Sequence, residues 1–233
     1  MHPQLKKTIN MIADKSLRQK VAALIENPTI EIEGKVYKGM PLEKSPAGLS
    51  HHHSYSGGLR EHMISTTNIA LTLCDTVENV YAGKVDRDSV VAGVLVHDIF
   101  KALTYIQREN GTYASAPIAE RLDHVTLGVA ELIRRGFPLD LVHIMDSHMG
   151  WQHGPIGPRT VEALIVHLAD MADSQLNGEV LRAAQYLLRT ATGIELSRIT
   201  ATEAFEIVNA KTRYGWDGVP KALKKMRKKR HQS

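Results

Sequence analysis

Apolar residues recur every three or four positions along most of the chain, which is the pattern of amphipathic helices. The stretch from Val90 to Val96 is nearly all apolar, so its helix is expected at the centre of the fold. Thr200 and Glu203 fit a capping box at the start of a helix. The spacing predicts helices at about 3–26, 59–82, 88–103, 118–135, 138–149, 160–176, 178–191 and 201–213, with a further one from Pro220.

Three stretches depart from this helical pattern. Residues 29–38 alternate apolar and polar side chains around Gly34, as a small β-hairpin does. Asn110 and Gly111 mark a turn that favours a second hairpin. The prolines and glycines of residues 41–58 predict a loop. The sequence therefore predicts an all-α protein, in which a helical core carries one or two small β-hairpins.

The composition is that of an ordinary globular protein. The 233 residues suffice for one compact domain with a sizeable core, and 43% of them are hydrophobic. Cys74 is the single cysteine, which excludes an intramolecular disulfide and a cysteine-based zinc site. No apolar run reaches the length of about 18 residues that a transmembrane helix needs. Residues 1–7 are not followed by the apolar core of a signal peptide. We therefore expect a cytoplasmic protein with no membrane partner.

The positive charge of the chain is concentrated near its end. The formal net charge is +4, and seven of the 29 basic residues lie between Lys221 and Arg230, where no acidic residue occurs. The other 22 basic residues face 25 acidic ones, a balance of −3. The sequence thus predicts a mildly acidic body with a cationic tail. The tail is either a nucleic-acid-binding element or a solvated terminal helix.

The chain contains 12 histidines, and several of them fall on predicted helices that would face one interior. His97 and Asp98 end the most apolar helix, where an imidazole and a carboxylate are costly to bury unless each has a partner. A metal ion would satisfy both side chains. In chain order the candidate ligands are distributed over five successive helices: His62, His97, Asp98, His124, His148 and Asp170.

This order of ligands resembles the HD-domain superfamily of metal-dependent phosphohydrolases, over about residues 50–177. Phe100 departs from the family pattern by replacing a small glycine, which is expected to narrow the pocket. Met149 stands where some relatives carry a second histidine. The motifs that match are the glycines before His62, His-Asp-Ile-Phe-Lys at 97–101, Asp-His-Val-Thr-Leu-Gly at 123–128, Ser-His-Met-Gly at 147–150 and the helix at 162–173.

The resemblance implies a three-part organisation around an HD-domain helical bundle. An N-terminal helix and hairpin at 1–49 would pack on the core. The phosphohydrolase core itself would occupy 50–177. C-terminal helices with the basic tail would follow at 178–233.

The resemblance also implies two metal sites that share one carboxylate. Asp98 would bridge two ions, the second of which is bound by His124 and His148. Two such cations clamp a phosphoryl group and activate water. All the ligands offer nitrogen or oxygen, which suits divalent transition metals. The family favours iron or manganese, while nickel, cobalt or zinc would also fit. The alternative is one ion, with the two later histidines binding substrate. The first ion would have three further ligands: His62, His97 and Asp170.

Three polar side chains near these ligands are further candidates. Lys101 lies one helical turn after His97 and matches the family motif, so we expect it to contact a substrate phosphate. The alternative is a lysine that extends to the surface. His167 and Asp173 each lie one turn from Asp170, and each either contacts the reacting groups or orients a ligand.

The remaining substrate-binding candidates lie outside the predicted ligand helices or at their edges. His52 and His53 belong to the glycine-bounded loop that leads to the first predicted ligand. Arg121 precedes the third ligand motif and is expected to face the cleft. Trp151 and Arg159 lie in a Gly/Pro-rich loop, where the indole would cap a flat heterocycle by stacking. The alternative is a surface loop with one packed tryptophan.

The chain has no Gly-x-Ser-x-Gly motif, no Walker A motif and no dinucleotide fingerprint. Hydrolysis by metal-activated water is therefore the favoured reaction, with Asp98, Lys101 and His167 as catalytic residues. The resemblance to HD-domain proteins implies a phosphodiesterase for a small phosphate ester, such as a 2′,3′-cyclic phosphate of a pterin or a nucleotide. The alternatives are exoribonuclease-like hydrolysis of RNA, or a non-catalytic protein that binds nucleic acid through its tail. The apolar late helices also leave a homo-oligomer open.

Overall fold

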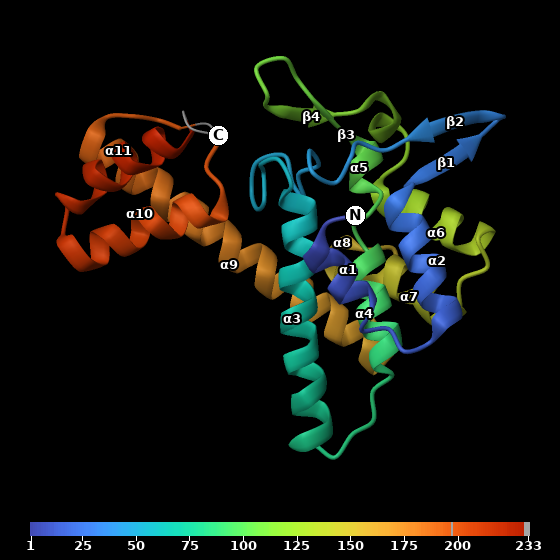
Figure 1. The fold of residues 1–233 in the computed structure, drawn as a ribbon. Coiled ribbons are helices and arrows are strands. Elements are labelled where there is room, and N and C mark those ends of the chain that lie inside the picture. Colours follow the sequence, from blue (N-terminus) through green and yellow to red (C-terminus); the bar gives the residue numbers. More distant parts are fainter. Residues whose placement is uncertain (197, 231–233) are drawn as a thin grey trace.

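The computed structural model describes residues 1–196 and 198–230, and Figure 1 shows them as a helical body with two small hairpins. The N-terminal elements are α1 (Pro3–Ile9), α2 (Lys15–Glu26), β1 (Thr29–Ile32), β2 (Lys35–Lys38), α3 (Gly58–Asn79), α4 (Arg87–Val96), α5 (Lys101–Thr104), β3 (Tyr105–Gln107) and β4 (Tyr113–Ser115). The later elements are a 3-10 turn, η1 (Pro117–Glu120), then α6 (His124–Arg134), α7 (Leu139–Ser147), α8 (Gly150–His153), α9 (Val161–Thr192), α10 (Ala201–Tyr214) and α11 (Gly218–Arg230).

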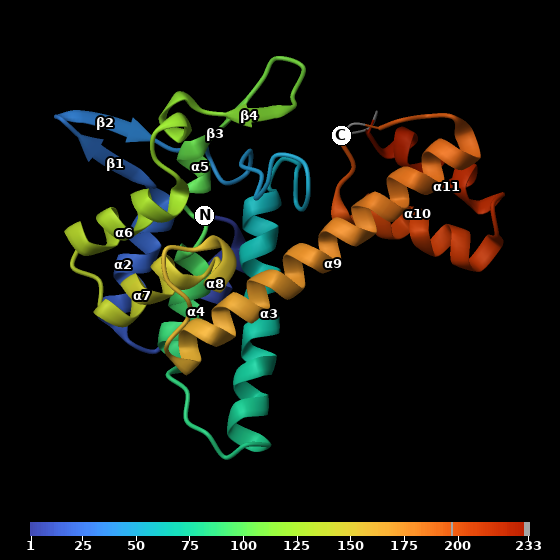
Figure 2. The ribbon, with the colours of Figure 1, turned by 180° about the vertical axis from the view of Figure 1, so that it is seen from behind.

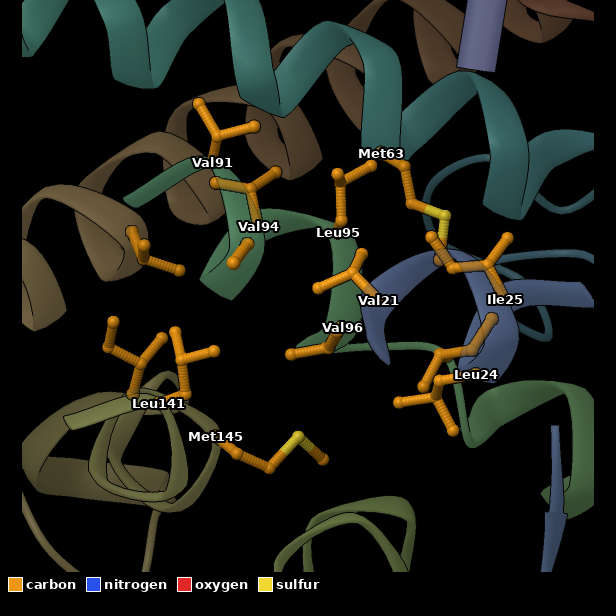
Figure 3. Close-up of a cluster of buried hydrophobic side chains, with 14 of the residues drawn as sticks. Val21, Leu24, Ile25, Met63, Val91, Val94, Leu95, Val96, Leu141 and Met145 are labelled. Atoms are coloured by element: carbon orange, nitrogen blue, oxygen red, sulfur yellow. The ribbon is translucent and has the colours of Figure 1, made fainter. Parts of the chain in front are cut away.

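Helix α4 lies at the centre of the larger hydrophobic core, as its apolar sequence predicts. Every residue of this helix from Ser89 to Val96 is buried. Helices α2, α3, α7 and α9 surround it and supply apolar side chains from all sides. Figure 3 shows Val94, Leu95 and Val96 between side chains of α2, α3 and α7. A helix in this position can present the residues at its end to the interior of the protein.

A second, smaller hydrophobic cluster forms around the far end of α9. It contains Leu181, Ala184 and Leu188 of α9, together with buried side chains of α10 and α11. Both views of the ribbon show α10 and α11 packed at this end, away from α4 (Figures 1 and 2). Tyr55 joins this cluster from the loop that precedes α3. That loop therefore connects the second cluster with the helix that carries His62.

Both predicted hairpins are present. Strands β1 and β2 pair antiparallel, with Ile30 opposite Tyr37, and β3 pairs with β4. The capping box predicted at Thr200 and Glu203 also forms. None of the helices in the described residues is long and apolar enough to cross a membrane.

The single helix predicted over residues 3–26 is wrong, because the chain forms α1 and α2 with a break between them. Asp14 caps α2 by accepting a hydrogen bond from the Leu17 N–H at 2.7 Å. The carboxylate of Asp88 accepts the backbone N–H groups of Ala13 and Asp14 at 2.8 and 2.7 Å. These N–H groups cannot also bond within a helix, so a distant residue fixes the break.

The predicted helices at 160–176 and 178–191 are one continuous helix, α9. The helix continues through Gly178. A Cβ at this position would be 3.3 Å from the His51 carbonyl oxygen, so the loop before α3 packs closely against α9 here. Glycine here allows close packing rather than a break. The domain boundary predicted after residue 177 thus falls inside a helix that joins the two hydrophobic clusters, and the three-part division stays a prediction.

Two further helices are shorter than predicted. Helix α4 ends at Val96, so His97 and Asp98 lie in the turn that follows it. The region predicted as one helix at 118–135 divides into the 3-10 turn and α6. Asp123 caps α6 by accepting from the Thr126 N–H at 2.7 Å. His124 is consequently the first residue of α6 and not an interior one.

Candidate metal centre

Four of the predicted ligands lie together where α3, α4 and α9 meet. The Nε2 atom of His62 is 3.2 Å from Nε2 of His97 and 3.3 Å from an oxygen of Asp98. It is also 3.2 Å from an oxygen of Asp170. These four side chains can each place one ligand atom within 4.8 Å of all the others. The arrangement forms a pocket of nitrogen and oxygen donors.

A second group shares Asp98 with the first. The other carboxylate oxygen of Asp98, Oδ1, lies 3.3 Å from Nε2 of His124 and 3.6 Å from Nε2 of His148. The two imidazole nitrogens are 3.3 Å apart. The carboxylate of Asp98 therefore faces one group with each of its oxygens, as a bridging carboxylate must.

The positions of the protons leave unshared electron pairs at the centre of both groups. Nδ1 of His97 is 2.7 Å from the Val94 carbonyl oxygen, and Nδ1 of His148 is 2.7 Å from that of Met145. A carbonyl only accepts, so both Nδ1 atoms carry the proton and both Nε2 atoms of the neutral rings carry a lone pair. Nδ1 of His62 donates to Asp173 at 2.7 Å. The Nε2 atoms of His62 and His97 thus meet as two acceptors.

This arrangement fits cations. Oδ1 of Asp98 is buried and has no hydrogen-bond partner among the described residues. A buried polar atom without a partner costs free energy, and so does a close approach of two lone pairs. Positive ions between the ligands would remove both costs. The donors are imidazole and carboxylate without sulfur, which suits first-row divalent metals.

The charges of the site follow the same pattern. Burial raises the pKa of Asp98, but the charge of the Lys101 ammonium outweighs burial and holds it well below its usual value. Burial opposes ionisation of Asp170 too, yet the proximity of the His62 and His97 rings holds its pKa well below its usual value. The pKa of His124 is lowered, chiefly by burial. Both carboxylates are therefore ionised at neutral pH and available as ligands.

Asp173 lies buried behind His62 and holds it in place. Its carboxylate accepts hydrogen bonds from Nδ1 of His62 at 2.7 Å, from Nε2 of His53 at 2.8 Å and from the Ser65 hydroxyl at 2.5 Å. A carboxylate on the far nitrogen of a histidine ligand fixes its tautomer and its orientation. The sequence left open whether Asp173 orients a ligand, and this geometry favours that interpretation.

His53 is fixed beneath the site and not presented to a substrate. Its Nε2 atom donates to Asp173, and its Nδ1 atom accepts from the Tyr55 hydroxyl at 2.9 Å. The backbone N–H of His53 donates to the side chain of Asn177 at 2.7 Å. His52, His53 and His62 also lie close enough to resemble a third metal site. Both nitrogens of His53 already have protein partners, so this ring has no lone pair free for an ion.

A pocket of about 440 Å³ opens beside the ligands. Lys101 lines this pocket, and its ammonium donates a hydrogen bond to Oδ2 of Asp98 at 2.6 Å. His167 also lines it and donates from Nδ1 to the His148 carbonyl oxygen at 2.7 Å. The complete lining is His52, Lys101, His148, Met149, Gly150, Trp151, Gln152, His153, His167, Asp170, Met171 and Ser174.

The structure separates the predicted substrate residues into two sets. His52, Lys101, His167 and Trp151 line the pocket, whereas Arg121 and Arg159 are exposed and lie outside its lining. The roles of these residues stay predictions. The expected narrowing by Phe100 has no counterpart in the lining, since Phe100 is fully buried in the larger core.

Sequence reasoning missed Ser65, Tyr55 and Met171. The spacing offers a signal for Ser65, which lies three residues after His62 and so shares its helix face. No local signal identifies Tyr55, because its contact with His53 depends on the loop before α3. Met171 is adjacent to Asp170, but only the position of α8 shows that it borders the pocket.

Comparison with known proteins gives consistent matches. Residues 59–174 match the HD domain family. The chain is 41% identical to dihydroneopterin 2′,3′-cyclic phosphate phosphodiesterase of Methanocaldococcus jannaschii over 212 residues, which are 91% of this chain and 84% of that protein. It is 30% identical to the 3′-5′ exoribonuclease YhaM of Bacillus subtilis over 145 residues, and 29% identical to YhaM of Listeria monocytogenes over 143 residues. Each exoribonuclease match covers 57% of this chain and 43% of the relative. No solved structure gives a significant match.

Proposed function

From the premise that this chain belongs to the HD-domain family, we propose that it hydrolyses the 2′,3′-cyclic phosphate of a small heterocyclic molecule. It is a metal-dependent phosphohydrolase of the phosphodiesterase type. The observation that carries the proposal is the pair of ligand groups that share Asp98, whose Oδ1 atom is buried without a partner. The relative from Methanocaldococcus jannaschii, which is similar over most of both chains, indicates the substrate class.

The residues proposed as ligands are those of the two groups. His62, His97 and Asp170 would hold one ion, His124 and His148 a second, and Asp98 both. We propose iron or manganese, which the HD-domain family favours, although the imidazole and carboxylate donors would also suit nickel, cobalt or zinc. Bound cations at such a site supply an activated water and stabilise the charge that develops on the phosphoryl group.

Lys101 is proposed to bind the phosphate. Its ammonium is buried at the floor of the pocket and is held by Asp98 at 2.6 Å. Burial alone would lower the pKa of Lys101, but the charges of Asp98 and Asp170 outweigh burial and raise the pKa above its usual value. The side chain therefore stays protonated. A protonated ammonium there attracts a non-bridging phosphate oxygen and stabilises the additional charge of the transition state.

His167 is proposed to orient the substrate. Because its Nδ1–H donates to the His148 carbonyl, the Nε2 atom of the neutral ring accepts hydrogen bonds. It can therefore hold a hydroxyl or N–H group of the substrate. To act as a general acid towards the ester oxygen that leaves phosphorus, the ring would first have to gain a proton.

His52 is proposed to contact the substrate without adding charge. Burial, together with the charges of His62 and Lys101, lowers its pKa to about 3. The ring is therefore neutral near pH 7, and its Nδ1 atom is buried without a partner in the described residues. A neutral imidazole beside Lys101 leaves the positive charge of the pocket to the ammonium.

A substrate panel tests the proposal. Protein purified without oxygen and supplied with Fe²⁺ or Mn²⁺ is incubated with dihydroneopterin 2′,3′-cyclic phosphate, adenosine 2′,3′-cyclic phosphate and a short RNA. We expect hydrolysis of the cyclic phosphates, with the pterin compound preferred, and loss of activity in Asp98→Asn. Hydrolysis of RNA alone, or equal activity of the variant, would contradict the proposal.

RNA hydrolysis is the second candidate, favoured by the basic face of α11. Lys224, Arg227 and Lys228 are exposed on this helix, while Glu206 partners Lys229 at 2.6 Å. Helix α11 packs on α10, at the end of α9 away from α4 (Figure 2). The double substitution Lys224→Glu, Lys228→Glu should weaken RNA binding in a salt-dependent manner if this candidate holds. Hydrolysis of cyclic phosphates should then be unaffected.

We also propose a homodimer, supported by an exposed apolar stripe on α9. Val161, Leu164 and Leu168 are all exposed, and they recur at spacings of three and four residues on one side of the helix. An antiparallel pairing of two copies would cover this stripe with the same stripe of the second copy. Sedimentation of the wild type and of Leu168→Glu measures whether a dimer forms and whether the charge disrupts it.

A further inference from the structure

The pocket beside the metal ligands has two unlike halves. His52, Lys101, His148 and Asp170 form a polar half that suits a phosphate. Trp151, Met149 and Met171 contribute large apolar side chains to the lining, and we call this group the apolar half. We infer that this apolar half is a stacking site for the flat ring of the substrate, with Trp151 as the residue that determines specificity. This inference rests on the proposed function and extends it to recognition of the ring.

The position of the indole is fixed by two glycines. Gly150 has a φ of +75°, and a Cβ at this position would overlap the His167 ring. A Cβ at Gly157 would overlap the indole of Trp151 itself. The indole therefore packs against the backbone at Gly157, and α8 begins close enough to α9 for Trp151 and His167 to meet.

Trp151 and His167 form a rigid corner of the pocket. Their ring centroids are 6.0 Å apart and the planes are nearly perpendicular, at 88°. His167 is itself tied to the His148 carbonyl. Only one imidazole thus separates the indole from the backbone of a proposed metal ligand. This separation suits a substrate whose ring and phosphate are joined by a short linker.

The remaining surface of Trp151 is open. Its exposed fraction is 66%, although it borders the pocket together with Met149 and Met171. Trp216 is the second tryptophan of the chain, and Lys211 covers its ring, with Nζ 4.7 Å from the centroid. No lysine or arginine within the described residues stacks on Trp151 in this way. An aromatic surface that is positioned but uncovered is suited to stacking on a planar ligand.

The chemistry of this corner selects a class of ligand. Stacking favours a planar, polarisable ring such as a pterin or a purine. Nε2 of His167 accepts a hydrogen bond, so the matching ring carries an N–H or amino group on the edge that faces it. A phosphodiester without a ring would use only the polar half of the pocket. Base–aromatic stacking corresponds to roughly 5- to 150-fold in affinity.

Steady-state kinetics with two substrates test the inference. Dihydroneopterin 2′,3′-cyclic phosphate carries the ring, and glycerol 1,2-cyclic phosphate carries the same type of phosphodiester without it. In Trp151→Ala, kcat/KM should fall at least about fivefold more for the pterin compound than for the glycerol compound. Trp151→Phe, which keeps an aromatic ring, should retain much of the wild-type preference for the pterin compound over the glycerol compound. Trp216→Ala is the matched control and should leave both values unchanged.

Binding of the ring alone separates this inference from the proposed function. Dihydroneopterin without phosphate is titrated into the wild type and into Trp151→Ala, and calorimetry measures its binding to both proteins. For the wild type, the intrinsic fluorescence is followed as well. We expect saturable binding by the wild type and at least fivefold weaker binding by the variant. Equal binding, or an equal loss for both cyclic phosphates, would overturn the inference. If the wild type binds the ring but hydrolyses neither cyclic phosphate, the proposed function fails and the stacking site stands.

Discussion

The two ends of α9 lie in regions that differ in where polar side chains are placed: one region buries them, and the other keeps them at the surface. Near Asp170, imidazoles, carboxylates and an ammonium are buried together beneath the larger apolar core. Near Leu188, the interior is apolar, and charged groups pair at the surface, as Glu206 does with Lys229. Burial of ionised groups opposes folding. The first region therefore carries a cost that the binding of cations would offset, whereas the second follows the rules of an ordinary helical core.

The two regions are nevertheless linked by hydrogen bonds. Tyr55 packs in the smaller cluster and donates to His53, which donates to Asp173, which accepts from His62. Asn177 of α9 holds both the backbone of His53 and, at 3.4 Å, the hydroxyl of Tyr55. His62, a proposed metal ligand, is thus oriented by residues whose own positions depend on the smaller cluster.

The largest expected effect comes from removing a shared ligand. In Asp98→Ala, both ligand groups lose their common carboxylate and Lys101 loses its partner. Activity and metal affinity should fall by more than the roughly 10- to 100-fold that loss of an outer hydrogen bond costs. Metal content after dialysis and phosphodiesterase assays measure this loss. Asp75→Ala, which alters an exposed carboxylate on α3, is the control and should change neither.

A substitution in the smaller cluster should affect stability before it affects metal binding. Leu188 is fully buried, so Leu188→Ala is expected to cost about 2–5 kcal/mol in the free energy of unfolding of its region. Leu176→Ala, at an exposed position of the same helix, is the matched control. Hydrogen exchange should rise in α10 and α11 and stay low in α4. Equal exchange in all helices would show that the two regions unfold as one unit.

Asp173→Asn tests the link between the regions. The amide retains the shape of the side chain but removes the charge that fixes the tautomer of His62. We expect metal affinity to fall by roughly 10- to 100-fold, with the fold retained. Competition with a chelator measures the affinity. Ser65→Ala removes a single hydrogen bond from the same carboxylate and should have a smaller effect, and an equal effect would argue against a special role of His62.

The smallest effect concerns the acid stability of α10 and α11. Burial raises the pKa of Glu203, but hydrogen bonds from Arg230 and from the Thr200 N–H lower it below its usual value. A carboxylate with a depressed pKa stabilises the fold above its unfolded pKa of about 4.3, and this contribution is lost as the pH falls through the folded value. Glu203→Gln should cost about 1 kcal/mol near neutral pH through the weakened cap and the lost ion pair. Thermal melts of wild type and variant should converge once the pH falls below the lowered folded pKa of Glu203.

Much of the architecture follows from local patterns in the sequence. The apolar run at Val90–Val96 predicts a central helix, and Gly34 and Gly111 mark both hairpins. The break after α1 could not be predicted in this way, because it depends on Asp88, which lies far along the chain. Gly178 shows the opposite limit, since a residue that often ends a helix lies here within α9, where it packs closely against the backbone of His51.

The candidate site was predictable to a different depth at different residues. The order of histidines and aspartates indicates the ligands, because each type of side chain is costly to bury alone. Helical spacing places Asp173 near Asp170 but cannot distinguish a substrate contact from a hydrogen bond to His62. For His53, the sequence favoured substrate binding, while the structure places both ring nitrogens on protein partners. Such choices depend on tertiary geometry that no local spacing contains.

The number of metal ions per chain tests the central claim most directly. The claim is that Asp98 joins two metal sites, of which only the second uses His124. Elemental analysis of protein purified without oxygen should give two ions per chain for the wild type and one for His124→Ala, with the folded state checked by circular dichroism. One ion in both proteins, or two in both, would contradict the claim.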